Sequence, residues 1–125
     1  MSDQNADQIR VEVRSWLAEN WDPTLDRGSW ARRVFEAGWS APGWEPQWGG
    51  RGLTEAQSRV VAKEFAAVGA RGSGMDRSDL LACTLHDLGT EEQKRRLIPP
   101  SVRAETRWCL LYSEPGAGSD LAGLR

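Results

Sequence analysis

The first twenty residues carry apolar side chains at helical spacing. Ile9, Val13, Trp16 and Leu17 follow one another at steps of four, three and one residue. These steps place all four side chains on one face of an α-helix, opposite a polar face. The pattern therefore predicts an amphipathic helix over residues 3–20.

A shorter helix is expected after a break rich in polar residues, proline and glycine. Ser29 can cap its N-terminus, because a serine side chain accepts a hydrogen bond from a backbone N–H of the first turn. The buried face would carry Trp30 and Val34, with Phe35 as a further candidate. Gly38 would end this helix.

Residues 39–52 show neither helical nor strand periodicity. They hold two prolines, four glycines and three tryptophans, Trp39, Trp44 and Trp48, so we expect an irregular loop. Tryptophans in such a loop usually bury their rings and fix the loop to the domain. We predict this anchoring role for all three, and direct contact with a ligand is the alternative.

A capping box predicts the start of a longer helix. Thr54 precedes Gln57 by three residues, so the two side chains can satisfy each other's backbone N–H groups. The helix would end at Gly69, where a glycine suits the C-terminal cap. Its apolar stripe would consist of Val60, Val61, Phe65 and Val68.

Two more helices are predicted farther along the chain. The first has a face formed by Leu80, Leu81, Thr84, Leu85 and Leu88. The second starts at another capping box, Thr90 with Gln93. This helix should end at Pro99 and Pro100, because a proline lacks an N–H group. A new helical turn should follow through about Arg103.

The character of the chain changes at residues 107–112, a short apolar and aromatic run bounded by Ser113 and Pro115. Such a run predicts a β-strand. No other segment shows a strand pattern, and a lone strand leaves its backbone N–H and C=O groups without partners. The predicted fold class is therefore mainly α, with one strand that lacks a visible partner.

Composition agrees with one ordinary folded domain. The 125 residues are 39% hydrophobic and 27% charged, with a formal net charge of -2, and this length allows an adequate core. No apolar run reaches the roughly 18–20 residues of a membrane span, and the N-terminus lacks the apolar segment of a signal peptide. We therefore expect a cytoplasmic protein. The scattered arginines form no basic stripe, which argues against nucleic-acid binding.

Few side chains offer chemistry. His86 is the only histidine, so neither a metal site nor a Ser-His-acid triad is expected. Its ring should instead bond the last carbonyl groups of its helix. Cys83 and Cys109 lie in apolar surroundings, and we expect two small buried thiols without a disulfide.

The glycine-rich stretch at residues 114–123 allows two interpretations. Gly116 and Gly118 could let backbone N–H groups converge on an anion, because no side chain blocks the approach. A turn in which Asp120 bonds its own backbone explains the same residues about equally well.

Four segments of the chain carry a likeness to a known family. They are residues 45–53 (Glu-Pro-Gln-Trp-Gly-Gly-Arg-Gly-Leu), Glu64 with Phe65, residues 89–94 with Pro99 and Pro100, and Trp108-Cys109 leading into Ser-Glu-Pro-Gly-Ala-Gly-Ser-Asp-Leu-Ala-Gly at 113–123. In this order they resemble the flavin-dependent acyl-CoA dehydrogenases. The last segment is similar to the family signature almost letter for letter.

The resemblance implies the architecture and the cofactor. Residues 1–105 would form an N-terminal helical bundle domain, and residues 106–125 the first strand and glycine-rich loop of a β-barrel middle domain. That strand and loop would lie against FAD. By position, the cofactor-binding residues would be Leu110, Tyr112, Ser113, Gly118 and Ser119. Ser119 would also lie near the acyl-CoA substrate.

The reaction implied is α,β-dehydrogenation of an acyl-CoA thioester, with a carboxylate base and hydride transfer to FAD. The family's base lies far downstream, so no residue of this chain is expected to be catalytic, and the isolated chain should be inactive. The implied partners are acyl-CoA, electron-transfer flavoprotein or a similar acceptor, and a homo- or hetero-oligomer. The alternative is a stand-alone helical interaction module or a degenerate subunit that pairs with another dehydrogenase chain.

Overall fold

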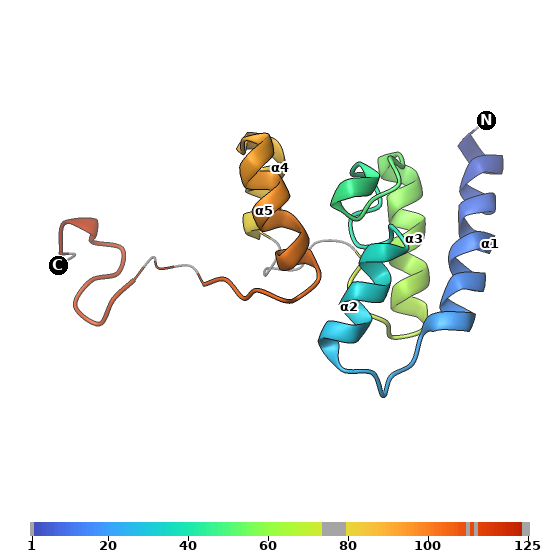
Figure 1. Cartoon of the computed structure of the whole chain (residues 1–125), viewed down its shortest axis with the longest axis horizontal. Coiled ribbons are helices and arrows are strands. Elements are labelled where there is room, and N and C mark those ends of the chain that lie inside the picture. Colours follow the sequence, from blue (N-terminus) through green and yellow to red (C-terminus); the bar gives the residue numbers. More distant parts are fainter. Residues whose placement is uncertain (1, 74–79, 110, 112, 124–125) are drawn as a thin grey trace.

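The computed structural model describes residues 2–73, 80–109, 111 and 113–123 of the chain. Within them it has five α-helices: α1 (Ser2–Asn20), α2 (Arg27–Glu36), α3 (Glu55–Ala67), α4 (Leu80–Leu88) and α5 (Glu91–Val102). Two short 3-10 helices are η1 (Pro46–Trp48) and η3 (Leu121–Gly123). Figure 1 shows α1, α2 and α3 as one group, α4 and α5 as a second, and the C-terminal segment extending away from both. The mainly α class is confirmed.

The first group of helices is held by the apolar faces that the sequence predicts. One buried cluster joins Ile9, Val13 and Leu17 of α1 to residues of the other two helices and their connections, namely Trp30, Val34, Trp39, Val61, Phe65 and Ala70. Each large apolar side chain buried in this way contributes about 1.5–3 kcal/mol. Val68 differs from the prediction, because it follows the end of α3 and is exposed.

Helix α2 begins earlier than predicted. Asp26 is its N-cap, and its carboxylate accepts hydrogen bonds from the backbone N–H of Ser29 at 2.9 Å and from the Ser29 hydroxyl at 2.6 Å. These bonds lower the pKa of Asp26. Ser29 therefore lies inside the first turn as a donor and does not cap it. The two predicted capping boxes, at Thr54 and Thr90, are both present.

The loop at residues 39–52 joins α2 to α3 in the sequence and packs against both groups of helices. Trp39 is buried in the first cluster, whereas Trp48 is buried in a second cluster with Ala82 of α4 and Ile98 of α5. Trp44 is partly buried against the second cluster. The predicted anchoring role of the three tryptophans is thus confirmed, and they fix the loop to two different helical groups.

Helix α5 continues through Pro99 and Pro100, so the predicted change to a new turn at the prolines is wrong. A proline removes its own N–H group but keeps its carbonyl group. The Pro99 carbonyl accepts from the backbone N–H of Arg103 at 2.9 Å, and the Ser101 hydroxyl donates to the Leu97 carbonyl at 2.7 Å. These bonds on either side of the prolines hold the last turn.

The apolar face predicted for α4 is only partly covered. Leu80 is 46% exposed and Leu88 is 83% exposed, while the side chain buried completely is Ala82. The reason is that α4 packs mainly against α5. The two cysteines form no disulfide, but Cys109 is exposed and Cys83 only half-buried, so their predicted burial is wrong.

The C-terminal segment does not form the predicted strand in the residues that are described. Residues 107–109 and 111 have no strand pairing, and Leu110 and Tyr112 lie outside the described residues. A strand needs a neighbouring strand for its hydrogen bonds, and the described part of the chain provides none. The helices of this part include none that is long and apolar enough to span a membrane.

Candidate functional site

The glycine-rich segment forms a tight turn. Glu114 and Ala117 make an isolated antiparallel bridge, in which the Glu114 N–H donates to the Ala117 carbonyl at 2.8 Å and the Ala117 N–H donates back at 3.1 Å. Pro115 and Gly116 occupy the two central positions. A proline there fixes its own φ near the value that the turn needs. A Cβ added to Gly116 would meet no atom within 4 Å, so this side of the turn is open.

The carboxylate of Asp120 fixes the second half of the loop. Its Oδ1 accepts from the backbone N–H of Gly118 at 2.9 Å, and its own carbonyl accepts from the N–H of Gly123 at 2.9 Å. This is the backbone-bonding role that one of the two interpretations of the sequence gave to Asp120. The N–H of Gly118 is therefore already paired within the loop.

The structure brings part of the predicted cofactor site together. A Cβ placed on Gly118 would lie 3.9 Å from the Ser113 hydroxyl, so the two residues are neighbours across the turn. Ser113 and Ser119 are both exposed. Leu110 and Tyr112 lie outside the described residues. Two exposed hydroxyls on a turn with little side-chain bulk fit the hydrogen-bonding edge of a flavin ring. The individual roles of these residues stay predictions.

A hydrogen-bonded pair connects Trp108, which precedes the glycine-rich segment, to α5. The indole N–H of Trp108 donates to the Ser101 hydroxyl at 2.7 Å, and the same hydroxyl donates to the Leu97 carbonyl at 2.7 Å. One hydroxyl can accept the first bond and donate the second. Sequence reasoning did not find this pair, because a serine and a tryptophan seven residues apart show no pattern.

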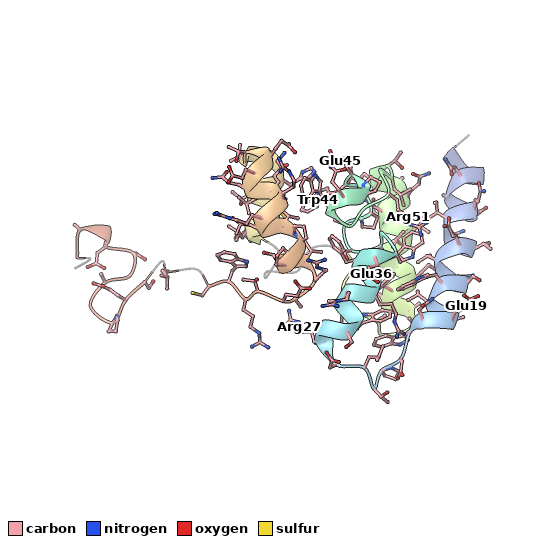
Figure 2. The ribbon with its side chains drawn as sticks, viewed as in Figure 1. Glu19, Arg27, Glu36, Trp44, Glu45 and Arg51 are labelled. Carbon is pink, nitrogen blue, oxygen red and sulfur yellow. The ribbon has the colours of Figure 1, made fainter. Side chains whose placement is uncertain are left out.

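His86 joins α4 to the loop at residues 39–52. Its Nε2 lies 2.9 Å from Glu45 Oε2, and its ring stacks on Trp44 with a centroid distance of 4.2 Å and an interplanar angle of 2°. Figure 2 shows Trp44 and Glu45 where the loop approaches α4. The hydrogen bond from His86 lowers the pKa of Glu45. The predicted bond from His86 to carbonyl groups of its own helix is wrong, since side chains of a distant loop take both the ring face and Nε2.

Glu64 is a buried acid that links α3 to α1. Its carboxylate lies 2.6 Å from Arg14 Nε and 3.6 Å from Arg10 Nε. The hydrogen bond to Glu64, together with the charge of that carboxylate, raises the pKa of Arg14. The arrangement fixes one helix on another, and the described residues contain no group of histidine, cysteine and acidic side chains that could hold a metal ion.

Comparison with known proteins gives a consistent picture. Residues 3–105 match the family described as "Acyl-CoA dehydrogenase, N-terminal domain". The chain is 34% identical to acyl-CoA dehydrogenase IpdE1 of Mycobacterium tuberculosis over 143 residues, covering 97% of this chain and 36% of that protein. It is 28% identical to the mitochondrial long-chain specific acyl-CoA dehydrogenase of Rattus norvegicus, covering 95% of this chain and 30% of that protein.

A solved structure is similar over nearly the whole chain. One chain of the crystal structure of the ChsE4-ChsE5 complex from Mycobacterium tuberculosis superposes with a TM-score of 0.65 at 31% identity, covering 97% of this chain and 33% of that chain. The present chain thus spans about a third of the length of these relatives.

Proposed function

The chain belongs to the acyl-CoA dehydrogenase family, and we propose that it supplies the N-terminal part of a flavin-dependent enzyme that oxidises an acyl-CoA to its trans-2-enoyl thioester. The observation that carries this proposal is the match of residues 3–105 to the N-terminal domain of the family. The segment 113–123 begins eight residues after that match ends and presents two exposed serines.

The contribution of this chain to the reaction is to bind and orient. FAD, when bound, would supply the acceptor for the β-hydrogen of the substrate. The hydroxyls of Ser113 and Ser119 would donate hydrogen bonds to the flavin ring, and a donor aimed at a ring nitrogen favours the reduced flavin. Ser119 would in addition lie beside the thioester end of acyl-CoA. Leu110, Tyr112 and Gly118 would complete the contact with FAD.

The base that removes the α-proton would come from outside this segment, so the 125-residue chain alone should be inactive. We further propose electron-transfer flavoprotein or a similar acceptor as the electron partner, and a cytoplasmic location. An oligomeric assembly is supported by the structural neighbour, which is itself part of a complex of two proteins. The same observation favours a second candidate function, in which this chain is a subunit that pairs with another dehydrogenase chain.

The reading frame after codon 125 separates the two candidates. A frame that continues into a strand-rich domain and a helical bundle supports the first, and a stop codon favours the second.

The role of Ser119 is tested in the full-length enzyme. There, Ser119→Ala should raise the dissociation constant for FAD or acyl-CoA, while the urea midpoint of the apoprotein stays unchanged. Ser15→Ala, at an exposed serine of α1, is the matched control. A loss of stability with unchanged affinity would contradict the binding role of Ser119 and leave it a structural residue of the turn.

A further inference from the structure

A cavity of about 400 Å³ lies between the two groups of helices. Its walls come from the connection between α1 and α2, from α2 itself, from the loop at residues 39–52, from the turn after α3 and from the end of α5. This volume falls in the range of about 300–1,000 Å³ that small-molecule sites occupy. None of the described lining residues belongs to the segment 113–123, so the cavity is separate from the proposed flavin loop.

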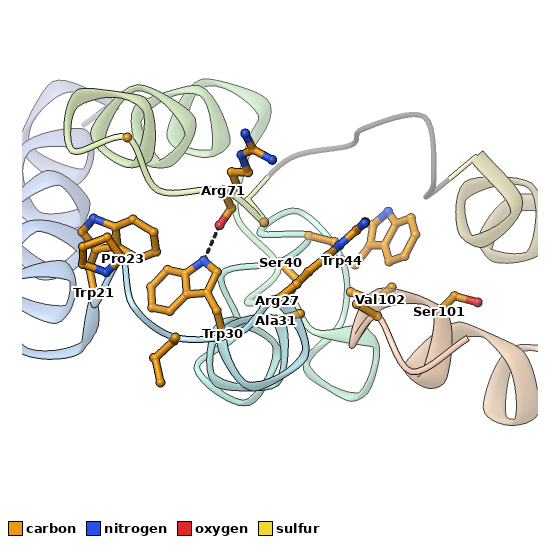
Figure 3. Close-up of a pocket in the computed structure, with 15 residues that line it drawn as sticks. Trp21, Pro23, Arg27, Trp30, Ala31, Ser40, Trp44, Arg71, Ser101 and Val102 are labelled. Atoms are coloured by element: carbon orange, nitrogen blue, oxygen red, sulfur yellow. Dashed lines mark hydrogen bonds between the residues drawn. The ribbon is translucent and has the colours of Figure 1, made fainter. Parts of the chain in front are cut away.

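Three indole rings form part of the apolar wall. They belong to Trp21, Trp30 and Trp44 (Figure 3). The indole N–H of Trp30 donates to the Arg71 carbonyl at 2.7 Å, and that of Trp21 donates to the Val68 carbonyl at 3.1 Å. Because their polar atoms are already paired, these two rings are held in place and offer apolar surface. Trp44 is held by its stack on His86.

The charges along the wall have one sign. Arg27 and Arg71 line the cavity, and no aspartate or glutamate is among its described lining residues. Neither arginine forms an ion pair with a residue that the structure describes. Figure 3 shows Arg27 extending on the side of Trp44, whereas the carbonyl of Arg71 faces Trp30. The guanidinium of Arg27, with no acidic side chain among the described lining residues, favours an anionic ligand.

A buried hydroxyl adds a directional group. Ser40 lines the cavity and is only 5% exposed. Among the described residues, no hydrogen bond donated by its hydroxyl is found. A serine hydroxyl can donate one hydrogen bond, and an oxygen of a ligand in the cavity could accept it.

We propose that this cavity binds a flat, apolar molecule that carries an anionic group, of the kind represented by a fused-ring aromatic carboxylate. The ring system would lie against the indoles of Trp30 and Trp44. The carboxylate would pair with Arg27, and Ser40 would donate a hydrogen bond to it. This binding does not require flavin, acyl-CoA or any residue of the segment 113–123.

Calorimetric titration of the 125-residue chain with naphthalene-2-carboxylate tests the proposal, with naphthalene-2-methanol as the neutral analogue. The carboxylate should bind at least about tenfold more tightly than the alcohol. Arg27→Gln should abolish most of this difference, and Ser40→Ala should weaken the carboxylate several-fold. Arg95→Gln, at an exposed arginine of α5 away from the cavity, should leave both affinities unchanged.

The position of the ligand is checked by the indole N–H signals in nuclear magnetic resonance spectra. Signals of Trp30 and Trp44 should shift on titration, whereas Trp48, which does not line the cavity, should not. Equal affinity for the carboxylate and the alcohol, an equal effect of Arg27→Gln and Arg95→Gln, or absence of binding would each overturn the proposal. None of these results bears on flavin binding, so the proposed function is tested separately.

Discussion

Replacing Ala104 by glycine should stabilise the protein. Ala104 has a φ of 58°, the one positive value at a residue other than glycine in the described part of the chain. Here α5 ends in a Schellman motif: the Ala104 N–H donates to the Ser101 carbonyl at 3.1 Å, and the Glu105 N–H donates to the Pro100 carbonyl at 2.9 Å. Glycine is the preferred residue at this left-handed position.

The expected gain follows from two opposing terms. The left-handed conformation costs an alanine roughly 1–2 kcal/mol. Glycine avoids this cost but loses about 0.5–1 kcal/mol more conformational free energy on folding. The free energy of unfolding should therefore rise by about 0.5–1 kcal/mol in Ala104→Gly.

Urea denaturation followed by circular dichroism measures this change. The midpoint of Ala104→Gly should rise while the slope with urea stays constant. Ala37→Gly is the matched control, because Ala37 caps α2 with a φ of -78°, where a glycine should cost about 0.5–1 kcal/mol. If both variants lower the midpoint equally, the backbone of Ala104 is not strained and the reasoning is refuted.

Two further predictions concern the contacts between elements. Ser101→Ala should speed hydrogen exchange of the Trp108 indole N–H about fivefold, as expected for the loss of a hydrogen bond worth ~1 kcal/mol. Ser101→Thr keeps the hydroxyl and should exchange like the wild type. Equal exchange rates in the wild type and both variants would count against the hydrogen bond. The lowered pKa of Glu45 means that its bond to His86 stabilises the fold above the ordinary pKa of a glutamate and is lost as pH falls through the lowered value. The variant His86→Phe keeps an aromatic ring on Trp44 but loses this bond. Its urea midpoint should therefore lie below that of the wild type at neutral pH, and the difference should shrink in acid. A difference that does not change with pH would show that the bond does not contribute to stability.

The helices could be predicted from the sequence where local interactions determine them. The boxes at Thr54 and Thr90 are satisfied within one turn, so four consecutive residues of sequence are enough to find them. The cap of α2 shows the limit, because Asp26 and Ser29 are both good capping residues. The structure has Asp26, whose carboxylate accepts from both the backbone and the hydroxyl of Ser29.

The contacts that combine the helices into a fold could not be predicted in this way. His86 bonds Glu45, which lies 41 residues earlier in the chain, and Arg14 bonds Glu64, which lies 50 residues later. Neither spacing corresponds to a helical or strand period, so a single sequence carries no signal for it. The cavity beside Trp30 is a further consequence of such distant contacts, because Arg71 and Val102 line it together with residues of the first half of the chain.

The positions of the four family-like segments show what each part of the resemblance means physically. The segment 45–53 holds Trp48 in the second cluster, Glu64 ties α3 to α1, and the segment 89–94 starts α5 with a capping box. A substitution in these three segments should therefore lower the free energy of unfolding and have no direct effect on the reaction. The fourth segment differs, because Ser113 and Ser119 are exposed on a turn that Asp120 already holds together. Removing either hydroxyl should therefore cost the turn little, so a loss of flavin affinity in Ser113→Ala or Ser119→Ala without a loss of stability would support the ligand contact proposed for them.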